Sequence, residues 1–424
     1  MSSLSNLARR LQFDLKNFSR GLRDLPPLDP PPAPPVLHGV AYAFGARHVP
    51  YVAGVQPNGA ITRARMDSHC TGQYTAWKGL IIRRGLGGRY PAFGEAERQT
   101  QTVSEGVGYA MLLAVLFAGY DPEARVLFDD VYRVATTHPA YASNEPALMD
   151  WKLDSALGGN ASAGGGWFAL DGDLDIALAL LMASKQWGNT GATNYQARAL
   201  AVIEALQRKS YRPDGASLSG GAANLTRMSD YMTGHYKAFK KATNDAFWDV
   251  ATNKAFFLYD RCQAVLSPPP VSLVPDFLVR VDTNTPTPDT QHLGDDGSLT
   301  TDCYSWNSCR VPFRMGCDYL ISGDDRARNV GSKLVDFFTK KHNGNLRLMT
   351  SGYRLNGDQL EPQSSYHPEA FISTLLPAAM GEARFQTQIN QLWNDADTRR
   401  ADSYYSMELQ LLSQVVAAGN WWAP

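Results

Sequence analysis

The chain contains 424 residues, 44% of them hydrophobic and 19% charged, which is ample apolar material for a large folded core. The net charge is −1 and no run of basic residues occurs, so the sequence argues against electrostatic binding of nucleic acids. Its apolar runs, such as 177–183, are shorter than the roughly 20 residues that span a bilayer. Collagen-like, fully disordered and membrane-spanning classes are therefore excluded.

The N-terminal stretch differs from the rest of the chain. Leucines recur at spacings of three and four from Leu4 to Leu22, which predicts an amphipathic helix that either docks on a surface or packs on its own domain. The stretch 25–35 is rich in proline and predicts a stiff linker. No apolar segment typical of a signal peptide is visible. We therefore predict an N-terminal extension over 1–35 and one folded domain over 36–424.

Helical periodicity dominates the predicted domain. Asp121 and Pro122 read as an N-cap followed by proline in the first helical turn. Apolar stripes at helical spacing then occur in five segments: Leu127, Val131 and Val134; Leu174, Leu178 and Leu181; Leu200, Ile203 and Leu206; Val330, Leu334 and Phe337; Leu409, Leu412 and Val416. Long loops over 158–166, 213–223, 267–299 and 344–365 separate the helices, and strand alternation is sparse. The pattern predicts an all-α domain of about a dozen helices whose long loops carry the function.

The five cysteines provide no metal-binding or redox motif, because none forms a C-x-x-C pair. Three of them fall close together at Cys303, Cys309 and Cys317, so a local disulfide and buried thiols are both open. Aromatic residues make up 11% of the chain, and they serve either the core or flat surfaces that stack on sugar rings or bases.

The first candidate site residue is Glu105, which lies at the start of the apolar segment 106–116. Surrounding Val, Gly, Tyr and Met side chains would partly desolvate this carboxyl and raise its pKa, as a general acid requires. The alternative is an ordinary glutamate at a helix start, where the helix dipole favours a negative charge.

The second candidate segment carries three carboxylates at a spacing of two, Asp171, Asp173 and Asp175, at the start of another apolar helix. One of them can cap the helix and another can lie in the first turn. Because capping does not need three carboxylates, we expect at least one to face a site.

A third segment, 304–314, gathers aromatic, amide and guanidinium groups just before a helix. Trp306, Asn307 and Arg310 are its central residues. They either contact and stack on a sugar or form a polar network that holds a loop.

Together these segments resemble glycoside hydrolase family 8 across nearly all of 36–424. The second segment fits the family signature closely, and the departures are Leu170, where Ser or Thr is usual, and Ala110, where Gly is usual. Supporting matches are Tyr74 with Trp77 and Lys78, the stretches 148–152 and 275–277, and the closing 419–422.

The resemblance implies an (α/α)6 barrel with a cleft across one end and inverting hydrolysis of a β-1,4-linked polysaccharide. Glu105 would be the general acid that protonates the departing oxygen. Asp171 would hold the sugar at the scissile position in a distorted, oxocarbenium-like ring.

The resemblance also implies substrate-binding residues. Trp151 and Trp306 would stack on sugars, and Arg310 would orient the base or the substrate. We include Tyr231 and Asn307 among the candidate substrate-binding residues.

The sequence leaves several candidates for the general base. One branch of the family has Asp where this chain has Asn307, and a neutral amide cannot accept the water proton. The other branch takes a Glu from a loop shortly upstream, but here Gly294 stands near its place. Asp295 and Asp296 are the candidate catalytic bases, and Asp302 is a third candidate.

We therefore predict an endo-glycosidase whose leading substrate is β-1,4-glucan or mixed-linkage β-glucan, with chitosan as the second choice. No metal or organic cofactor is implied, because two carboxylates and water suffice. A rival hypothesis is a carbohydrate-binding protein on the same scaffold that has lost its base. We expect a monomer with a polysaccharide as its partner, and a secreted or periplasmic location from the resemblance alone.

Overall fold

The computed structural model describes residues 40–93, 99–160, 165–219, 224–291, 301–360, 368–398, 401 and 403–424. The chain divides into two units, Met1–Pro34 and Pro35–Pro424. The predicted N-terminal helix and proline-rich linker lie outside the described residues, and all the described elements belong to the second unit.

Six described helices of this unit form a closed inner ring. They are α3 (Ser104–Leu116), α5 (Leu170–Trp187), α7 (Thr233–Thr243), α9 (Val311–Ser322), α11 (Glu369–Ala379) and α13 (Tyr404–Ala417). Each helix packs against the next one in this order, and α13 packs back onto α3. Nearly every residue of α3, α9, α11 and α13 is buried, as expected for helices surrounded by protein on all sides.

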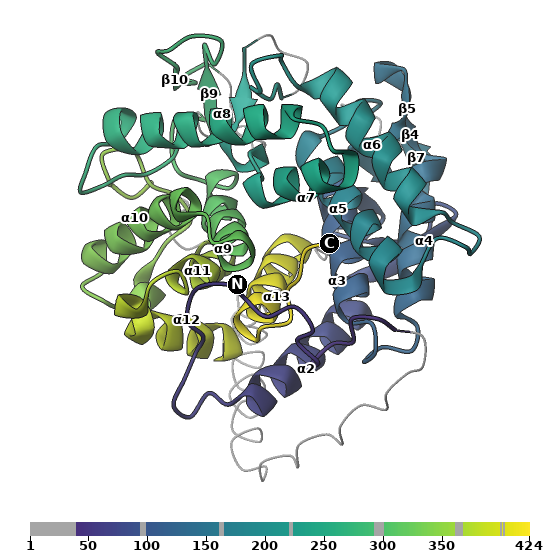
Figure 1. Ribbon diagram of the computed structural model, residues 1–424, viewed down its shortest axis with the longest axis horizontal. Coiled ribbons are helices and arrows are strands. Elements are labelled where there is room, and N and C mark those ends of the chain that lie inside the picture. The colour runs from purple at the N-terminus through teal and green to yellow at the C-terminus, as the bar shows by residue number, and fades with distance from the viewer. Residues whose placement is uncertain are drawn as a thin grey trace, which may run out of the picture. The chain divides into compact units, whose positions relative to one another are not determined.

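Six further helices pack outside this ring. They are α2 (Arg63–Leu80), α4 (Ala124–Thr137), α6 (Tyr195–Ser210), α8 (Phe247–Arg261), α10 (Asp325–Lys341) and α12 (Gln386–Thr398). Inner and outer helices alternate along the chain from α2 to α13 (Figure 1). This arrangement is the predicted (α/α)6 barrel.

The helical stripes read from the sequence are confirmed in α4, α5, α6, α10 and α13. The predicted cap at Asp121 is wrong, because α4 begins at Ala124 with Glu123 in the N-cap position. Asp121 instead accepts hydrogen bonds from the backbone N–H of Glu123 at 3.0 Å and from the Tyr74 hydroxyl at 2.7 Å. Its carboxylate therefore closes the turn before the helix and ties that turn to α2.

The strands are short, antiparallel and confined to the loops. β1 (Ile82–Gly85) pairs with β2 (Gly88–Pro91), and β4 (Pro139–Ala140) pairs with β5 (Glu145–Met149). Two three-stranded sheets have the orders β3-β6-β7 (Gln101–Val103, Lys152–Asp154, Gly159–Asn160) and β10-β9-β8 (Thr287–Pro288, Phe277–Val279, Thr226–Arg227). Strand β3 runs directly into α3, so the first sheet fixes the point at which that inner helix begins.

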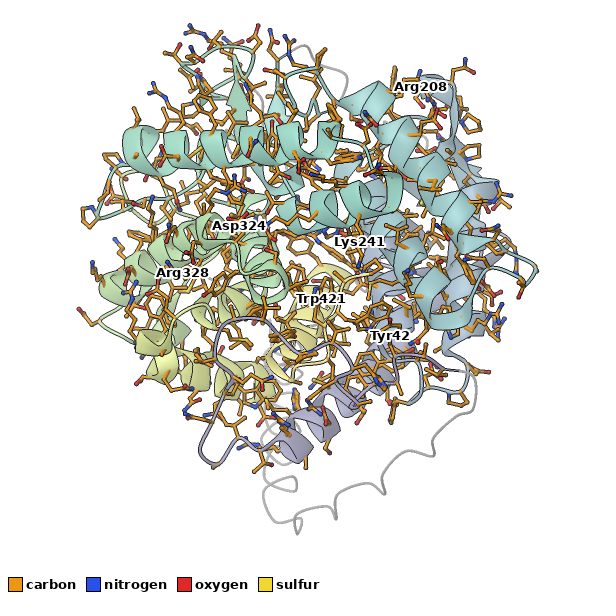
Figure 2. All side chains as sticks on the ribbon, in the orientation of Figure 1. Tyr42, Arg208, Lys241, Asp324, Arg328 and Trp421 are labelled. Atoms are coloured by element: carbon orange, nitrogen blue, oxygen red, sulfur yellow. The ribbon has the colours of Figure 1, made fainter. Side chains whose placement is uncertain are left out.

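The C-terminal ends of the inner helices are covered by the first and last described segments, 40–56 and 418–424. The rings of Tyr42 and Trp422 stack with centroids 4.2 Å apart, and the Gln186 side chain donates to the Tyr42 carbonyl at 2.9 Å. Figure 2 labels Tyr42 and Trp421 in this layer. The opposite end, where the inner helices begin, carries Glu105 and Asp171.

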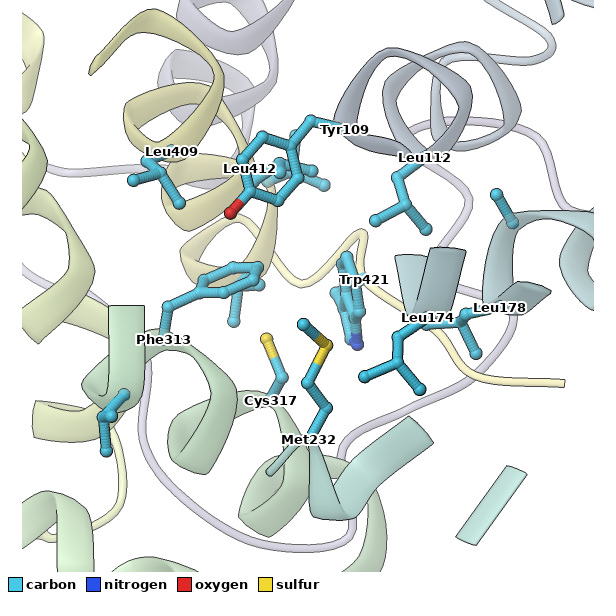
Figure 3. Close-up of a cluster of buried hydrophobic side chains, with 14 of the residues drawn as sticks. Tyr109, Leu112, Leu174, Leu178, Met232, Phe313, Cys317, Leu409, Leu412 and Trp421 are labelled. Atoms are coloured by element: carbon cyan, nitrogen blue, oxygen red, sulfur yellow. The ribbon is translucent and has the colours of Figure 1, made fainter. Parts of the chain in front are cut away.

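The interior of the ring is filled with apolar side chains from several inner helices (Figure 3). The cluster includes Tyr109, Leu112, Leu174, Leu178, Phe313, Cys317, Leu409, Leu412 and Trp421. Burying such a side chain stabilises the fold by about 1.5–3 kcal/mol. All five cysteines are buried and free, so the buried-thiol alternative is confirmed and the local disulfide is not formed.

Within the described part of the chain, no helix combines the length and the apolar character needed to cross a membrane.

Candidate active site

Close packing of α3 against α5 brings Glu105 and Asp171 together at the starts of the two helices. Gly108 faces α5, and a Cβ atom there would lie 2.7 Å from the Cβ of Asp175 and 3.0 Å from the Gly172 carbonyl oxygen. A Cβ on Gly172 would in turn collide with Ser104. Glycine at these two positions therefore allows the backbones to approach until both carboxyls reach one guanidinium.

That guanidinium belongs to Arg310, at the end of a short 3₁₀ turn (Ser308–Arg310) that leads into α9. Its Nη1 donates to Oδ2 of Asp171 at 2.6 Å and also to Oε1 of Glu105. Its Nη2 donates to Oδ1 of Asn307 at 2.9 Å. The Arg310 side chain is only 2% exposed, so these pairs interact with little screening by water.

Glu105 is the carboxyl whose environment favours the protonated form. Burial raises its pKa, and although Arg310 opposes this effect, the charge of Asp171 supports it and the pKa lies above the ordinary value. Two phenols hold the group in place: the Tyr109 hydroxyl donates to Oε1 at 3.3 Å and the Tyr404 hydroxyl donates to Oε2 at 3.1 Å. The carboxyl of Glu105 is thus held in a fixed position at the start of α3, with a raised pKa.

Asp171 shows the opposite behaviour. Burial alone would raise its pKa, but Arg227 and Arg310 outweigh burial and hold the pKa well below its ordinary value. Nη1 of Arg227 donates to Oδ2 at 3.0 Å, and the backbone N–H of Gly172 donates to Oδ1 at 3.0 Å. Asp171 is therefore a stable carboxylate beside a carboxyl whose pKa is raised, and such a difference can give two acids separate roles.

A third carboxyl, Asp230, completes this buried group. Nη1 of Arg227 lies 3.9 Å from Oδ1 of Asp230, and the guanidinium stacks 5.3 Å from the centre of the Phe277 ring. Burial raises the pKa of Asp230 to about 7. Among the described residues, Arg227 and Arg310 oppose the effect of burial on all three carboxyls, and one proton on the three would balance the two positive charges.

Asn307 is positioned by another buried carboxylate, Asp276. Its Nδ2 donates to Oδ2 of Asp276 at 3.2 Å while its Oδ1 accepts from Arg310, so both ends of the amide are used. Asp276 also accepts from the backbone N–H groups of Ser305 at 3.0 Å and Ser308 at 2.8 Å. This geometry favours the polar-network hypothesis for this segment and makes Asn307 a positioning residue for Arg310.

The three carboxylates at the start of α5 take three different partners. None of them caps the helix, because its N-cap residue is Ala169, which makes no side-chain hydrogen bond. Asp171 faces Arg310 as described. Oδ1 of Asp173 accepts from the backbone N–H of Met149 at 3.1 Å. Asp175 pairs with Arg314 and accepts from Nε2 of His235 at 2.8 Å, deeper in the barrel.

The three candidate aromatic residues are placed differently. Trp151 is half-buried, and its carbonyl accepts from the backbone N–H of Ser104, next to Glu105, at 2.9 Å. Trp306 is half-buried and packs edge-on against Phe371 with centroids 5.0 Å apart. Tyr231 is fully buried, and its hydroxyl accepts from the Ser217 N–H at 3.1 Å, so the structure places it in the core and away from solvent.

Of the candidate bases, Asp295 and Asp296 lie outside the described residues, whereas Asp302 is described and half-buried. The backbone on either side of Asp302 is anchored beside the site. The Thr301 carbonyl accepts from Phe277 at 3.1 Å and the Cys303 carbonyl accepts from Asp276 at 2.7 Å.

Comparison with known proteins identifies the family to which this fold and site belong. The model of the glycosyl hydrolases family 8 matches residues 67–419. A β-glucanase of Niallia circulans is 32% identical over 403 residues, covering 91% of this chain and 94% of the relative. An endoglucanase of Bacillus sp. strain KSM-330 is 30% identical over 393 residues, covering 89% and 81%. The apo structure of a β-1,3-1,4-glucanase from Paenibacillus sp. X4 superimposes with a TM-score of 0.82 at 32% identity, covering 91% of this chain and all of that one.

The chain belongs to glycosyl hydrolase family 8. It is a glycoside hydrolase with the (α/α)6 barrel of that family. Within the described residues, no group of His, Cys, Asp and Glu side chains is arranged to hold a metal ion. At this end of the family 8 barrel, the described residues bring the carboxyls of Glu105 and Asp171 together on Arg310.

Four residues of this family 8 site were not identified from the sequence: Arg227, Asp230, Tyr109 and Tyr404. Arg227 lies in a two-residue strand, where no periodicity marks it. Tyr109 was visible as the residue four positions after Glu105, a spacing that puts both on one face of a helix. Tyr404 is separated from Glu105 by 299 positions, and only the closure of α13 onto α3 brings them together.

Proposed function

We propose that the enzyme hydrolyses internal β-1,4 linkages of β-glucan by inverting general acid–base catalysis, with Glu105 as the acid. The observation that carries this proposal is the contact of Glu105 and Asp171 with one nitrogen of Arg310 while their pKa values shift in opposite directions. Glycoside hydrolysis uses a carboxyl with a raised pKa beside a carboxyl that stays ionised.

The two carboxyls would act in sequence on the same sugar. Glu105, whose raised pKa favours the protonated form, gives its proton to the glycosidic oxygen as the bond breaks. Positive charge then develops on the sugar ring, and the Asp171 carboxylate is held nearby to stabilise it. Arg310 holds the two carboxyls at fixed positions. Its positive charge stabilises the carboxylate that Glu105 becomes after proton transfer.

The base would come from the neighbouring loop and not from Asn307. Both polar atoms of that amide are engaged, and an amide has no basic site for the water proton. Inversion needs the base carboxylate roughly 6.5–9.5 Å from the acid, with water between them. Asp302, Asp295 and Asp296 remain the predicted candidates, since the chain on both sides of Asp302 pairs with 276–277 beside Asn307.

The proposed substrate class is that of the relatives, which are a β-glucanase, an endoglucanase and a β-1,3-1,4-glucanase. Mixed-linkage β-glucan and cellulose-type glucan are therefore the proposed substrates, and chitosan is the comparison polymer in the test. Export to the compartment that holds such polymers stays a prediction.

The first experiment measures reducing-sugar release from barley β-glucan, carboxymethyl-cellulose, xylan and chitosan. We expect release from the two glucans, with the α-anomer appearing first by NMR, and a loss of about 10²–10⁴-fold in kcat for Glu105→Gln. The matched control is Glu123→Gln, because that side chain is 65% exposed before α4 and away from Arg310. Equal activity of the Glu105→Gln and Glu123→Gln variants would overturn the assignment of the acid.

The base is tested by Asp295→Asn, Asp296→Asn and Asp302→Asn, each with and without sodium azide. Azide attacks without needing deprotonation, so it should restore turnover only in the variant that lacks the base. If all three variants keep wild-type kcat, none of these residues is the base.

A further inference from the structure

Two exposed aromatic side chains lie near the acid and have no role in the chemistry above. Trp167 is 53% exposed and Tyr141 is 66% exposed. Among the described residues, the only other aromatic side chain that is comparably exposed is Phe257, at 40%, on the outer helix α8. Trp and Tyr are enriched at recognition surfaces, where they often carry much of the binding energy.

Trp167 is connected to the catalytic residues by the backbone. Its carbonyl accepts from the Trp151 N–H at 2.8 Å, and the Trp151 carbonyl accepts from the Ser104 N–H at 2.9 Å, directly before Glu105. Along the chain, Trp167 precedes Asp171 by only four residues. The ring of Trp167 is therefore carried by the segment that also positions the acid and its carboxylate partner.

Tyr141 is held beside Trp167 through Gly166. The Ala142 N–H donates to the Gly166 carbonyl at 2.8 Å. A Cβ on Gly166 would lie 2.7 Å from Cζ of Tyr141, so the phenol ring rests directly against the Gly166 backbone. The N–H of Gly166 is in turn fixed by Oδ1 of Asp150 at 2.9 Å.

We propose that Trp167 and Tyr141 form a sugar-stacking surface that binds the glucan chain where it extends past Trp151, away from the catalytic carboxyls. This proposal rests on the proposed function and adds a binding site to it. A β-linked glucose ring presents a flat face of C–H groups, which packs on an aromatic face, while its hydroxyl groups remain in water. Because Tyr and Trp have few rotatable bonds and their backbone is already fixed here, little conformational entropy is lost on binding.

The site distinguishes long chains from short ones, since only a polymer bound at Glu105 can also reach the stacking surface. In the active enzyme, Trp167→Ala should raise KM for barley β-glucan roughly fivefold to tenfold, the loss expected for one stacked ring, and leave kcat within twofold. Hydrolysis of a short cello-oligosaccharide should change less than twofold. Tyr141→Ala should act in the same direction, and the double variant should exceed either single one.

The control is Phe257→Ala, which removes an exposed aromatic ring from the outside of the barrel and should leave both KM values at wild-type levels. Binding is measured separately in the Glu105→Gln background by native gel retardation in β-glucan. We expect weaker retardation when Trp167→Ala is added and no change when Phe257→Ala is added. Since both rings are exposed, circular dichroism and Tm should match the wild type in all variants.

The outcomes separate this inference from the proposed function. Wild-type KM and retardation in the Trp167→Ala variant, with glucan hydrolysis intact, would overturn the stacking surface and leave the function standing. Retardation by β-glucan that depends on Trp167, in a protein that hydrolyses no glucan, would support the surface and overturn the function. Retardation unaffected by either ring would mean that these side chains serve something other than glucan, such as a protein partner, and would also overturn the inference.

Discussion

Nη1 of Arg310 donates to Oδ2 of Asp171 at 2.6 Å, and the same nitrogen reaches the carboxyl of Glu105. One guanidinium nitrogen thus contacts both the proposed proton donor and the carboxylate proposed to stabilise the transition state. Because Arg310 is almost completely buried, its replacement leaves two carboxyls facing each other without an equivalent cation.

Arg310→Lys should lower kcat by about 10²-fold, because an ammonium cannot bridge both carboxyls and still reach Asn307 in one planar geometry. KM should change much less than kcat. Steady-state kinetics on barley β-glucan checks this expectation, and Arg328→Lys on the outer helix α10 is the matched control. Near-wild-type kcat in Arg310→Lys would show that the bridge is not needed for the reaction.

The Tyr404 hydroxyl predicts a shift in pH dependence. It donates to Oε2 of Glu105 at 3.1 Å and so favours the ionised carboxyl, although burial keeps the pKa of Glu105 above its ordinary value. Tyr404→Phe removes this donor, which should raise the pKa of Glu105 further. Because the acid must be protonated to act, the alkaline limb of the kcat/KM profile should move to higher pH.

The neighbouring tyrosine supplies the control for that experiment. The Tyr405 hydroxyl donates to the Trp306 carbonyl, so Tyr405→Phe removes a phenol hydroxyl without removing a bond to Glu105. Its alkaline limb should coincide with that of the wild type. An unshifted limb in Tyr404→Phe would mean that another group controls this side of the profile.

Asn307→Asp should destabilise the protein. The new carboxylate would replace Nδ2, which donates to Oδ2 of Asp276 at 3.2 Å, and would leave two buried acceptors facing each other. We expect the free energy of unfolding to fall by about 1–3 kcal/mol in urea denaturation. Asn253→Asp is the control, because Asn253 is exposed and accepts from Arg326 at 2.9 Å, where a negative charge is tolerated. Unchanged stability in Asn307→Asp would contradict the positioning role of Asn307.

Much of this fold was predictable because apolar residues at helical spacing, only three or four positions apart, indicate which face of a helix is buried. The stripe Leu127, Val131 and Val134 predicts α4, and all three side chains are buried in it. Glu105 and Asp171 were likewise visible, since each begins an apolar helix and the resemblance pairs them.

The remainder of the site depends on contacts that no local pattern encodes. Arg227 reaches Asp171 across 56 positions, from a two-residue strand whose place is set by pairing with β9. Asp121 has the residue type of a helix cap, yet tertiary partners on α2 compete for its carboxylate, so the predicted helix start was wrong. The residue types around Asn307 suit either a contact to sugar or a polar network that holds the loop. Only its hydrogen bonds to Asp276 and Arg310 favour the polar network.

Asp230 predicts how stability depends on pH. Burial raises the pKa of Asp230 from an ordinary value near 4 to about 7, so the folded state binds this proton more tightly than the unfolded state. The stabilisation from Asp230 is complete below about pH 4 and is lost as the pH rises through about 7. Arg227, Asp171 and Arg310 are the charged groups that influence this titration.

Asp230→Asn removes that titration and nearly preserves the shape of the side chain. Between about pH 4 and 7, the free energy of unfolding of the wild type should fall relative to Asp230→Asn by up to about 1.4 kcal/mol per pH unit. Urea denaturation at half-unit steps of pH measures both slopes. Parallel curves for the two proteins would show that Asp230 does not hold the extra proton.

The packing of α3 on α5 predicts opposite effects for two glycine-to-alanine changes. At Gly108 the new methyl group would lie 2.7 Å from the Cβ of Asp175 and 3.0 Å from the Gly172 carbonyl oxygen, so the helices must separate. We expect a loss of about 1–3 kcal/mol in the free energy of unfolding. At Gly72, in the exposed part of α2, no atom lies within 4 Å of the added methyl, and alanine should stabilise by about 0.5–1 kcal/mol.

The same pair tests how the site is positioned. If the close approach of α3 and α5 sets the geometry of Glu105 and Asp171, Gly108→Ala should lower kcat at temperatures where the variant is still fully folded, because a displacement of about 1 Å can cost 10²-fold in rate. Gly72→Ala should keep wild-type kcat. Full kcat in a folded Gly108→Ala enzyme would mean that the hydrogen bonds of the two carboxyls position them without the close approach of the helices, and that the glycine serves only the packing of the barrel.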